Sequence, residues 1–298
     1  MFTGCGTALV TPFRQDFTLD EQTLRRLVRR QIVAGVNFLV PCGTTGESPT
    51  LTRAEHLRVV EITLEEANGK VPVLAGAGGY NTHEVIELAR ELERMGVNGI
   101  LSVTPYYNKP TQEGLYQHYQ AIAAAVRLPI IVYSVQGRTG VNVEPATLAR
   151  LAKIDNIIGV KEASGNISQI ANVIHETRSS FTVLSGDDAI TIPLIALGGQ
   201  GVISVVSNEI PEEMTALTQA ALRGDFDAAR RIQAKFLPLM NVNFIESNPI
   251  PVKAAMARMG LVLPVWRLPM CPPSEASQAK IERVLENVGL LGSVQVAS

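Results

Sequence analysis

The sequence predicts an α/β protein, a (β/α)8 TIM barrel with a C-terminal helical appendage. Eight short, largely apolar stretches alternate with amphipathic helical stretches in the first 224 residues. None of the eight alternates strictly between apolar and polar residues, as expected of parallel strands that are covered on both faces. Eight such β-α units are typical of this barrel. The expected strands are residues 7–10, 38–41, 71–75, 99–103, 130–133, 157–161, 181–184 and 202–206.

The stretches between these strands carry helix signals. Thr18-x-x-Glu21 and Thr52-x-x-Glu55 have the spacing of capping boxes, which satisfy free N–H groups at a helix start. A doubly wound sheet is the alternative, but it usually has fewer strands and a glycine-rich nucleotide turn. Gly76-Ala77-Gly78-Gly79 lacks the full spacing of such a turn, so we interpret it as an ordinary turn.

The strand signals stop after Gly224, which predicts a barrel domain over 1–224 and a helical domain over 225–298. Residues 225–239, 251–259 and 274–290 are expected to form helices. The first has one apolar stripe, made of Phe226, Ala229, Ile232 and Phe236. We expect this domain to pack on the barrel or on a neighbouring subunit. It shows no catalytic constellation.

Composition narrows the function classes. The net charge of −2 and the pI near 6.1 argue against a nucleic-acid or anionic membrane partner. The three cysteines are widely spaced and form no CxxC motif, which favours a reducing cytoplasm over a disulfide framework. We find no signal-peptide pattern and no apolar run near the ~20 residues of a membrane span. A cytoplasmic location is therefore expected.

Chemistry in this barrel lies at the carboxyl ends of the strands. One apolar stretch ends in Lys161, and lysine is rarely buried unless it is paired or functional. An apolar wall lowers the pKa of such an amine, and a neutral amine attacks ketones to give a Schiff base. The alternative is a lysine that extends from the strand end into solvent. Other strand ends carry polar residues in Gly43-Thr44-Thr45-Gly46-Glu47, Pro105-Tyr106-Tyr107-Asn108, Tyr133-Ser134 and Ser185-Gly186-Asp187-Asp188.

Metal ligation has little support. The four histidines all fall in predicted helices and share no ligand spacing; they are His56, His83, His118 and His175. We therefore predict no metal site. Taken singly, a strand-end tyrosine is more often a wall residue and a threonine between glycines more often a turn cap.

Several motifs together resemble one enzyme family. The combination of Gly43–Glu47, Tyr133, Arg138-Thr139-Gly140 and Gly159-Val160-Lys161-Glu162-Ala163 is similar to the dihydrodipicolinate synthase and N-acetylneuraminate lyase family. Pro105-Tyr106-Tyr107-Asn108-Lys109-Pro110 resembles the dihydrodipicolinate synthase branch. The resemblance runs through Asn248–Lys253 and Arg267-Leu268-Pro269 and covers nearly the whole chain.

This resemblance implies a lyase that condenses pyruvate with L-aspartate-4-semialdehyde on the diaminopimelate route to lysine, without a cofactor. It implies that Lys161 forms the Schiff base with pyruvate and that Tyr133 is the proton shuttle. Thr44 would link Tyr133 to Tyr107, which in this family comes from a neighbouring subunit. A homo-oligomer, either a dimer or a dimer of dimers, is therefore implied.

The same resemblance assigns the substrate contacts. Thr45 would bind the pyruvate carboxylate, Arg138 the carboxylate of the semialdehyde, and Gly186 and Ile203 would line the pocket. The chain departs from the family in Tyr133-Ser134-Val135-Gln136, where Tyr-Asn-Val-Pro is usual. We expect loss of the proline to free the loop that carries Arg138.

Lysine-sensitive members bind lysine at a subunit interface. The matching positions are Ser48, His56, Tyr80, Glu84 and Tyr106. Tyr80 replaces the usual asparagine, and nearby Arg53 replaces a histidine. A larger ring and an added positive charge oppose the ammonium of lysine, so we expect weak or absent lysine inhibition.

Two alternatives remain at this stage. A sister lyase that cleaves sialic acid or a 2-keto-3-deoxy sugar acid would share Lys161 and Tyr133, although Arg138 and the Tyr106-Tyr107 pair argue against it. A non-catalytic barrel that only binds a keto acid is the second alternative, because a fold does not fix a function.

Overall fold

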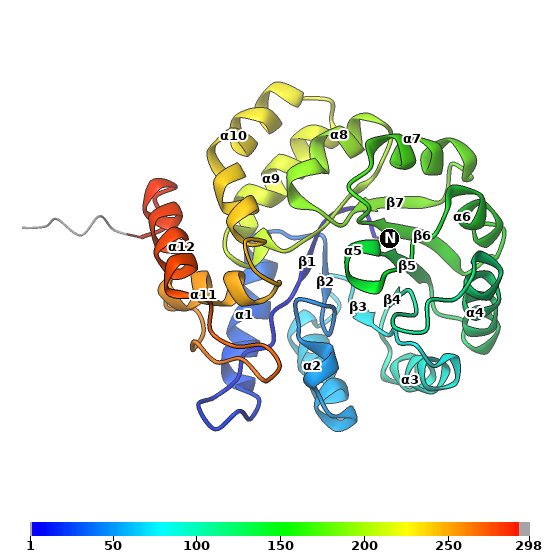
Figure 1. Cartoon of the computed structure of the whole chain (residues 1–298), viewed down its shortest axis with the longest axis horizontal. Helices are drawn as coiled ribbons and strands as arrows, with labels where there is room; N and C mark the ends of the chain where they lie inside the picture. Colours follow the sequence, from blue (N-terminus) through cyan, green and yellow to red (C-terminus); the bar gives the residue numbers. More distant parts are fainter. Residues whose placement is uncertain (1, 292–298) are drawn as a thin grey trace, which may run out of the picture.

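The structure, a computed structural model, describes residues 2–291 and contains eight parallel strands ringed by helices (Figure 1). The strands pair in the order β2-β1-β8-β7-β6-β5-β4-β3. The Leu39 N–H donates to the Pro72 carbonyl at 2.9 Å and joins the two ends of this order. The predicted barrel is thereby confirmed. The strands are β1 (Gly4–Ala8), β2 (Phe38–Val40), β3 (Leu74–Gly76), β4 (Gly99–Val103), β5 (Ile130–Ser134), β6 (Ile157–Glu162), β7 (Thr182–Ser185) and β8 (Gly201–Ser204).

The first strand differs most from its prediction. Residues 7–10 were expected, whereas β1 begins at Gly4 and ends at Ala8. Gly4 pairs with Gly201 of β8, which extends the strand toward the N-terminus. Beyond Ala8, the Val10 N–H donates to the side chain of Asn208 at 3.2 Å instead of to a neighbouring strand. A distant side chain therefore ends the strand early.

Helices connect the strands on the outside of the barrel. Thr52 and Glu55 form the predicted capping box of α2. The other predicted box is wrong, because Asp20 caps α1 by accepting from the Thr23 N–H, and Thr18 bonds Asp16 instead. The helices of the barrel are α1 (Glu21–Val33), α2 (Arg53–Ala67), α3 (Thr82–Met95), α4 (Gln112–Ala125), α5 (Gln136–Thr139), α6 (Pro145–Leu151), α7 (Ile167–Glu176), α8 (Thr191–Ala196) and α9 (Pro211–Leu222), with 3-10 turns η1 (Ser48–Thr50), η2 (Asp188–Ile190) and η3 (Val206–Asn208).

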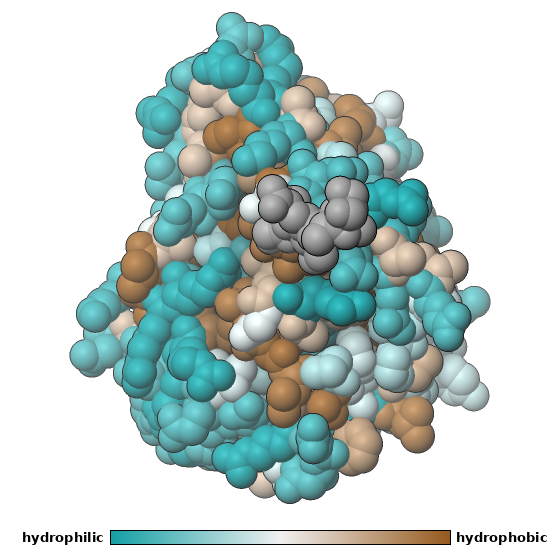
Figure 2. All heavy atoms as spheres, turned by 90° about the vertical axis from the view of Figure 1, so that its left-hand side faces the viewer, coloured by the Kyte–Doolittle hydropathy of each residue, from teal (hydrophilic) through white to brown (hydrophobic). Residues whose placement is uncertain are grey.

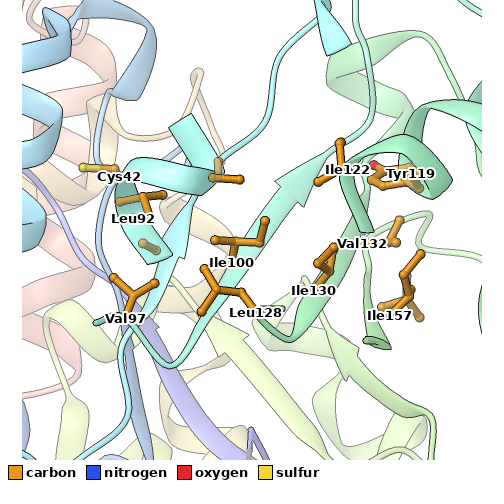
Figure 3. Packing of buried hydrophobic residues seen from close by; sticks show 14 of the residues in the cluster. Cys42, Leu92, Val97, Ile100, Tyr119, Ile122, Leu128, Ile130, Val132 and Ile157 are labelled. Atoms are coloured by element: carbon orange, nitrogen blue, oxygen red, sulfur yellow. The ribbon is translucent and has the colours of Figure 1, made fainter. Parts of the chain in front are cut away.

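Each strand has an outer and an inner face. Ile130 and Val132 of β5 point outward into the packing between barrel and helices that Figure 3 shows, where Ile122 of α4 also lies. Ile131 and Tyr133 belong to the separate cluster inside the barrel. Because side chains alternate along a strand, this register turns Tyr133 inward.

The helical domain consists of α10 (Phe226–Val242), α11 (Ile250–Arg258) and α12 (Glu275–Asn287). The three predicted helices are confirmed with small shifts at their ends. They lie at one side of the barrel (Figure 1), and hydrophobic side chains interrupt the hydrophilic surface in the middle of that side (Figure 2). α10 packs against α9, and one apolar cluster runs from β8 and α9 into all three helices. In residues 2–291, no helix combines the length and apolarity needed to cross a membrane.

Candidate active site

Lys161 lies at the carboxyl end of β6, inside the barrel. It pairs in register with Tyr133 of β5, so both side chains point to the same face. The Lys161 Nζ lies 4.2 Å from the centroid of the Tyr133 ring, and Lys161 is 4% exposed. Within residues 2–291, no carboxylate lies within ion-pair distance of this amine. The structure therefore presents a buried amine beside a phenol.

Gly186 leaves the space that the Lys161 side chain occupies. A Cβ at this position would lie 3.2 Å from Lys161 Cε and 2.6 Å from Ala163 Cβ. Its N–H donates to the Glu162 carbonyl at 2.7 Å, which holds the backbone close to β6. Ile203 of β8 is fully buried in the interior cluster that contains Tyr133. Gly186 thus directly follows β7, and Ile203 lies on β8, the next strand around the barrel.

The loop after β2 carries the two threonines. Its hydrogen bonds are internal and tight: the Gly46 N–H donates to the Gly43 carbonyl and the Glu47 N–H to the Thr44 carbonyl, both at 3.1 Å. Thr45 is 2% exposed, and its Oγ1 accepts from the Asn248 Nδ2 at 3.0 Å. This bond uses a lone pair of the hydroxyl oxygen and not its proton. The proton can therefore donate to a bound anion.

A cavity of ≈ 340 Å³ opens beside Tyr133. Thr44 and Arg138 line it together with apolar residues of β4. Arg138 lies on α5, where its guanidinium donates to the Asn248 carbonyl at 2.9 Å. The cavity thus combines a hydroxyl, a phenol and a guanidinium, which suits an acidic substrate of small size.

The segment that lacks the family proline is ordered as a helical turn. Gln136 begins α5, and its carbonyl accepts from the Gly140 N–H at 2.9 Å. The buried Thr139 hydroxyl bonds the Val135 carbonyl at 3.1 Å. These bonds hold Arg138 at the cavity even though the proline is absent.

Tyr107 does not join the site of its own chain. It is 91% exposed and has a left-handed backbone with φ 70°. Tyr106 lines the cavity instead, and its ring packs edge-on against Tyr80 at 5.2 Å. Among residues 2–291, no hydrogen bond links Tyr133 to Thr44 or to Tyr107.

The positions of the expected lysine site lie next to the active-site cavity. Ser48, His56 and Tyr106 line its wall, whereas Tyr80 and Glu84 lie further out. The His56 Nε2 is 3.0 Å from the Gly76 carbonyl, and burial lowers the His56 pKa to about 4. The charge of Arg53 also lowers this pKa, although its guanidinium pairs with Glu91 at 3.0 Å.

Sequence reasoning gave the helical domain no part in the site, yet Asn248, Lys253 and Arg267 of this domain contact the threonine loop, Gly43–Glu47. Asn248 bonds Thr45, and the Lys253 Nζ lies 2.5 Å from Glu47 Oε1. A signal was present in the sequence, because Lys253 interrupts the otherwise apolar stretch from Ile250 to Met256. A charge at such a position is rare without a buried partner.

Comparison with known families decides the relationship. The model of the dihydrodipicolinate synthetase family matches residues 1–288. The chain belongs to this family. It is 53% identical over 295 residues to a 4-hydroxy-tetrahydrodipicolinate synthase of Koribacter versatilis, covering 99% of this chain and 98% of that protein.

Solved structures of family members agree with this assignment. The dihydrodipicolinate synthase of Thermotoga maritima has a TM-score of 0.96 and 48% identity, covering 98% of this chain and 100% of that one. A chloride-inhibited dihydrodipicolinate synthase from Acinetobacter baumannii, complexed with pyruvate, has a TM-score of 0.96 and 42% identity with the same coverage. The family fold therefore extends through the helical domain.

Proposed function

We propose that the chain is a 4-hydroxy-tetrahydrodipicolinate synthase that condenses pyruvate with L-aspartate-4-semialdehyde through a Schiff base on Lys161. The observation that carries this proposal is the buried Lys161 amine beside the Tyr133 ring at the barrel mouth. Similarity to enzymes that carry this name, at 50 to 53% sequence identity over nearly the whole chain, also supports the proposal.

Lys161 supplies the covalent chemistry. Its neutral amine attacks the ketone carbon of pyruvate, and loss of water gives an imine. The protonated imine draws electrons from the methyl group, so loss of one methyl proton gives an enamine. The enamine carbon then forms a bond to the aldehyde carbon of the semialdehyde.

Tyr133 moves the protons that these steps require. A phenol is a weak base at neutral pH, so it needs a partner that relays the proton onward. Thr44, which lines the same cavity, is the first relay group. Tyr107 of a second copy is the next, and its 91% exposure leaves it available to another chain. The active form is accordingly a dimer or a dimer of dimers in the cytoplasm.

Two groups bind the substrate carboxylates. The Thr45 hydroxyl donates to the pyruvate carboxylate, while its oxygen accepts from Asn248. Arg138 faces the cavity from α5 and offers a planar fork to the carboxylate of the semialdehyde. Gly186 and Ile203 shape the wall around the imine.

The relatives favour this activity over the two alternatives. Eight relatives that are 48 to 53% identical carry the synthase name. Arg138 and Tyr106 both line the cavity, and the guanidinium suits the carboxylate of the semialdehyde rather than the hydroxyl groups of a sugar acid. A keto-acid-binding barrel without catalysis would not need a buried, carboxylate-free amine.

Borohydride trapping tests the proposal. Incubation with pyruvate and borohydride, followed by peptide mass spectrometry, is expected to place a reduced pyruvyl adduct on Lys161. Turnover with aspartate semialdehyde, but not cleavage of sialic acid, is expected in a coupled assay. An adduct on Lys109 or Lys253, or none at all, would overturn the assignment.

A further inference from the structure

The helical domain and the threonine loop meet at a buried ion pair. The Lys253 Nζ of α11 lies 2.5 Å from Glu47 Oε1, and the two side chains are 0% and 1% exposed. Arg267, also from the helical domain, donates its backbone N–H to the other carboxylate oxygen at 3.4 Å. Glu47 is the last residue of the Gly-Thr-Thr-Gly-Glu motif, so the ion pair holds the end of the threonine loop.

An aromatic ring and a second cation surround Lys253, and the charge of Arg267 opposes that of the Lys253 ammonium. Its Nζ lies 4.5 Å from the centroid of the Phe13 ring, and the Arg267 guanidinium covers the same ring at 4.3 Å. An aromatic face stabilises a cation. Removing two charges from water is costly, so a buried ion pair is weak evidence of a purely stabilising role.

The loop between the anchors is held in an uncommon backbone conformation. Cys42 at its start has φ 56° and Glu47 at its end has φ 52°, both in the left-handed region. Residues other than glycine are strained in this region and persist there where surrounding contacts fix them. Thr44 and Thr45 lie between these two strained positions. Their side-chain directions therefore depend on what holds the loop ends.

A second contact from the same segment reinforces the first. Asn248 precedes α11 and donates to the Thr45 hydroxyl oxygen at 3.0 Å. Lys253 follows five positions later on α11 and binds Glu47. One short segment of the helical domain thus holds the loop at two residues, one on each side of Gly46.

We propose that Lys253 is a positioning residue for the Schiff-base reaction: its ion pair with Glu47 fixes the loop that aims Thr44 and Thr45 at pyruvate. This inference rests on the proposed function, because it assumes that the loop binds pyruvate. It gives the helical domain an indirect part in substrate binding, through the Gly43–Glu47 loop. Displacements near 1 Å in a binding group can lower rates by about 100-fold.

Three variants separate positioning from stability. Lys253→Met removes the ammonium and leaves Glu47 as an unpaired buried carboxylate. Glu47→Gln combined with Lys253→Met removes both charges, which relieves that penalty while the anchor stays absent. Glu47→Asp keeps the charges but shortens the carboxylate by one methylene. Leu285→Ala is the matched control, because Leu285 is fully buried in α12 of the same domain.

The readouts are thermal unfolding and the pyruvate concentration that half-saturates borohydride trapping on Lys161. We expect the double variant to recover stability relative to Lys253→Met, while its half-saturating pyruvate concentration stays 10- to 100-fold above that of the parent. Glu47→Asp is expected to fall between parent and double variant. Leu285→Ala is expected to lower the unfolding temperature without changing half-saturation.

The outcomes are distinct. If the double variant recovers both stability and pyruvate saturation, the pair only stabilises the fold and the positioning role is overturned. The positioning role is also overturned if Glu47→Asp and a folded Lys253→Met both have the same half-saturating pyruvate concentration as the parent. If the parent protein itself forms no adduct with pyruvate, the proposed function fails, and this result is separate from any effect of the variants.

Discussion

Two lysines are buried in this molecule, and their surroundings are opposite. Lys161 lies at a strand end inside the barrel, 4% exposed, beside the ring of Tyr133 and, within residues 2–291, without a carboxylate partner. Lys253 lies in the helical domain, fully buried, and pairs with Glu47. Burial lowers the pKa of Lys253, and the Glu47 carboxylate acts against this shift. The Glu47 carboxylate favours the charged form of the Lys253 amine and holds it by an ion pair, whereas within residues 2–291 no ion pair holds the Lys161 amine.

The largest expected effect is the loss of turnover when Lys161, the lysine that we propose forms the imine, is replaced. Lys161→Met keeps the length of the side chain but removes the nucleophile. We expect turnover to fall by at least about 10⁴-fold, with no pyruvyl adduct after borohydride, because no second amine takes over the imine step. Steady-state assay and mass spectrometry of the intact protein measure both. If Lys161→Met still gains the mass of one reduced pyruvyl group, as the parent does, the roles assigned to Lys161 and Lys253 are exchanged.

Replacement of the two lysines is expected to change the free energy of unfolding differently, with a loss for Lys253 and no loss for Lys161. Lys253→Met leaves the Glu47 carboxylate buried and unpaired, and we expect the free energy of unfolding to fall by about 3–5 kcal/mol. Lys161→Met removes an amine whose charged form has no counter-ion, and we expect no loss or a gain of up to about 1 kcal/mol. Urea unfolding of the two variants measures this difference. Equal losses would show that the environments of the two amines are not opposite.

The neighbour of Lys161 offers the next test. Tyr133→Phe keeps the ring that lies 4.2 Å from the amine and removes only the hydroxyl. We expect turnover to fall by about 100- to 1000-fold, because proton transfer by a positioned group contributes effects of this size. Trapping with pyruvate is expected to slow without disappearing. Unchanged turnover would reduce Tyr133 to a packing residue of the barrel wall.

The sequence predicted a buried lysine at the end of β6 but not the ion pair of Lys253, and the reason is the range of the interactions. Lys161 and Tyr133 follow from local rules: apolar runs give strands, strands give a barrel, and alternation turns both side chains inward. Glu47 and Lys253 are 206 positions apart in the chain. Nothing near either residue indicates its partner, so only the fold shows the pair.

Two element boundaries also differ from their predictions, one because of a long-range contact and one because of a local one. The strand β1 ends at Ala8 because the Val10 N–H bonds Asn208, which lies 198 positions away. The helix α1 begins after Asp20 because Asp20 is the better cap, a local choice that the capping-box spacing at Thr18 concealed.

A weaker ion pair at the same domain boundary gives a pH test. Arg267 and Glu55 lie 2.5 Å apart, and the Arg267 hydrogen bonds lower the Glu55 pKa to about 2. The lowered pKa means that this stabilisation is complete above the ordinary pKa near 4.5 and is lost as pH falls from there to about 2. We expect a contribution of about 1–2 kcal/mol, reduced by solvent because both side chains are partly exposed.

Unfolding of the parent and Glu55→Gln across this pH range measures that contribution. The two proteins are expected to differ most above pH 4.5 and to converge toward pH 2. Glu113 is a fitting control, because its pKa is also lowered, by Arg150, but at a fully exposed site remote from the domain boundary. A gap between parent and Glu55→Gln that stays constant with pH would show that the pair contributes nothing to the docking of the two domains.

The smallest expected effect concerns a third amine, that of free lysine. Its ammonium also needs an anion, and at the wall of the cavity the Arg53 charge is close enough to lower the pKa of His56. Tyr80 packs its ring edge-on against Tyr106, which lines the same wall. We therefore expect little or no inhibition by lysine, with less than half of the activity lost at 1 mM. Arg53→His combined with Tyr80→Asn removes both obstacles and is expected to increase inhibition, whereas half-maximal inhibition of the parent at submillimolar lysine would contradict the argument.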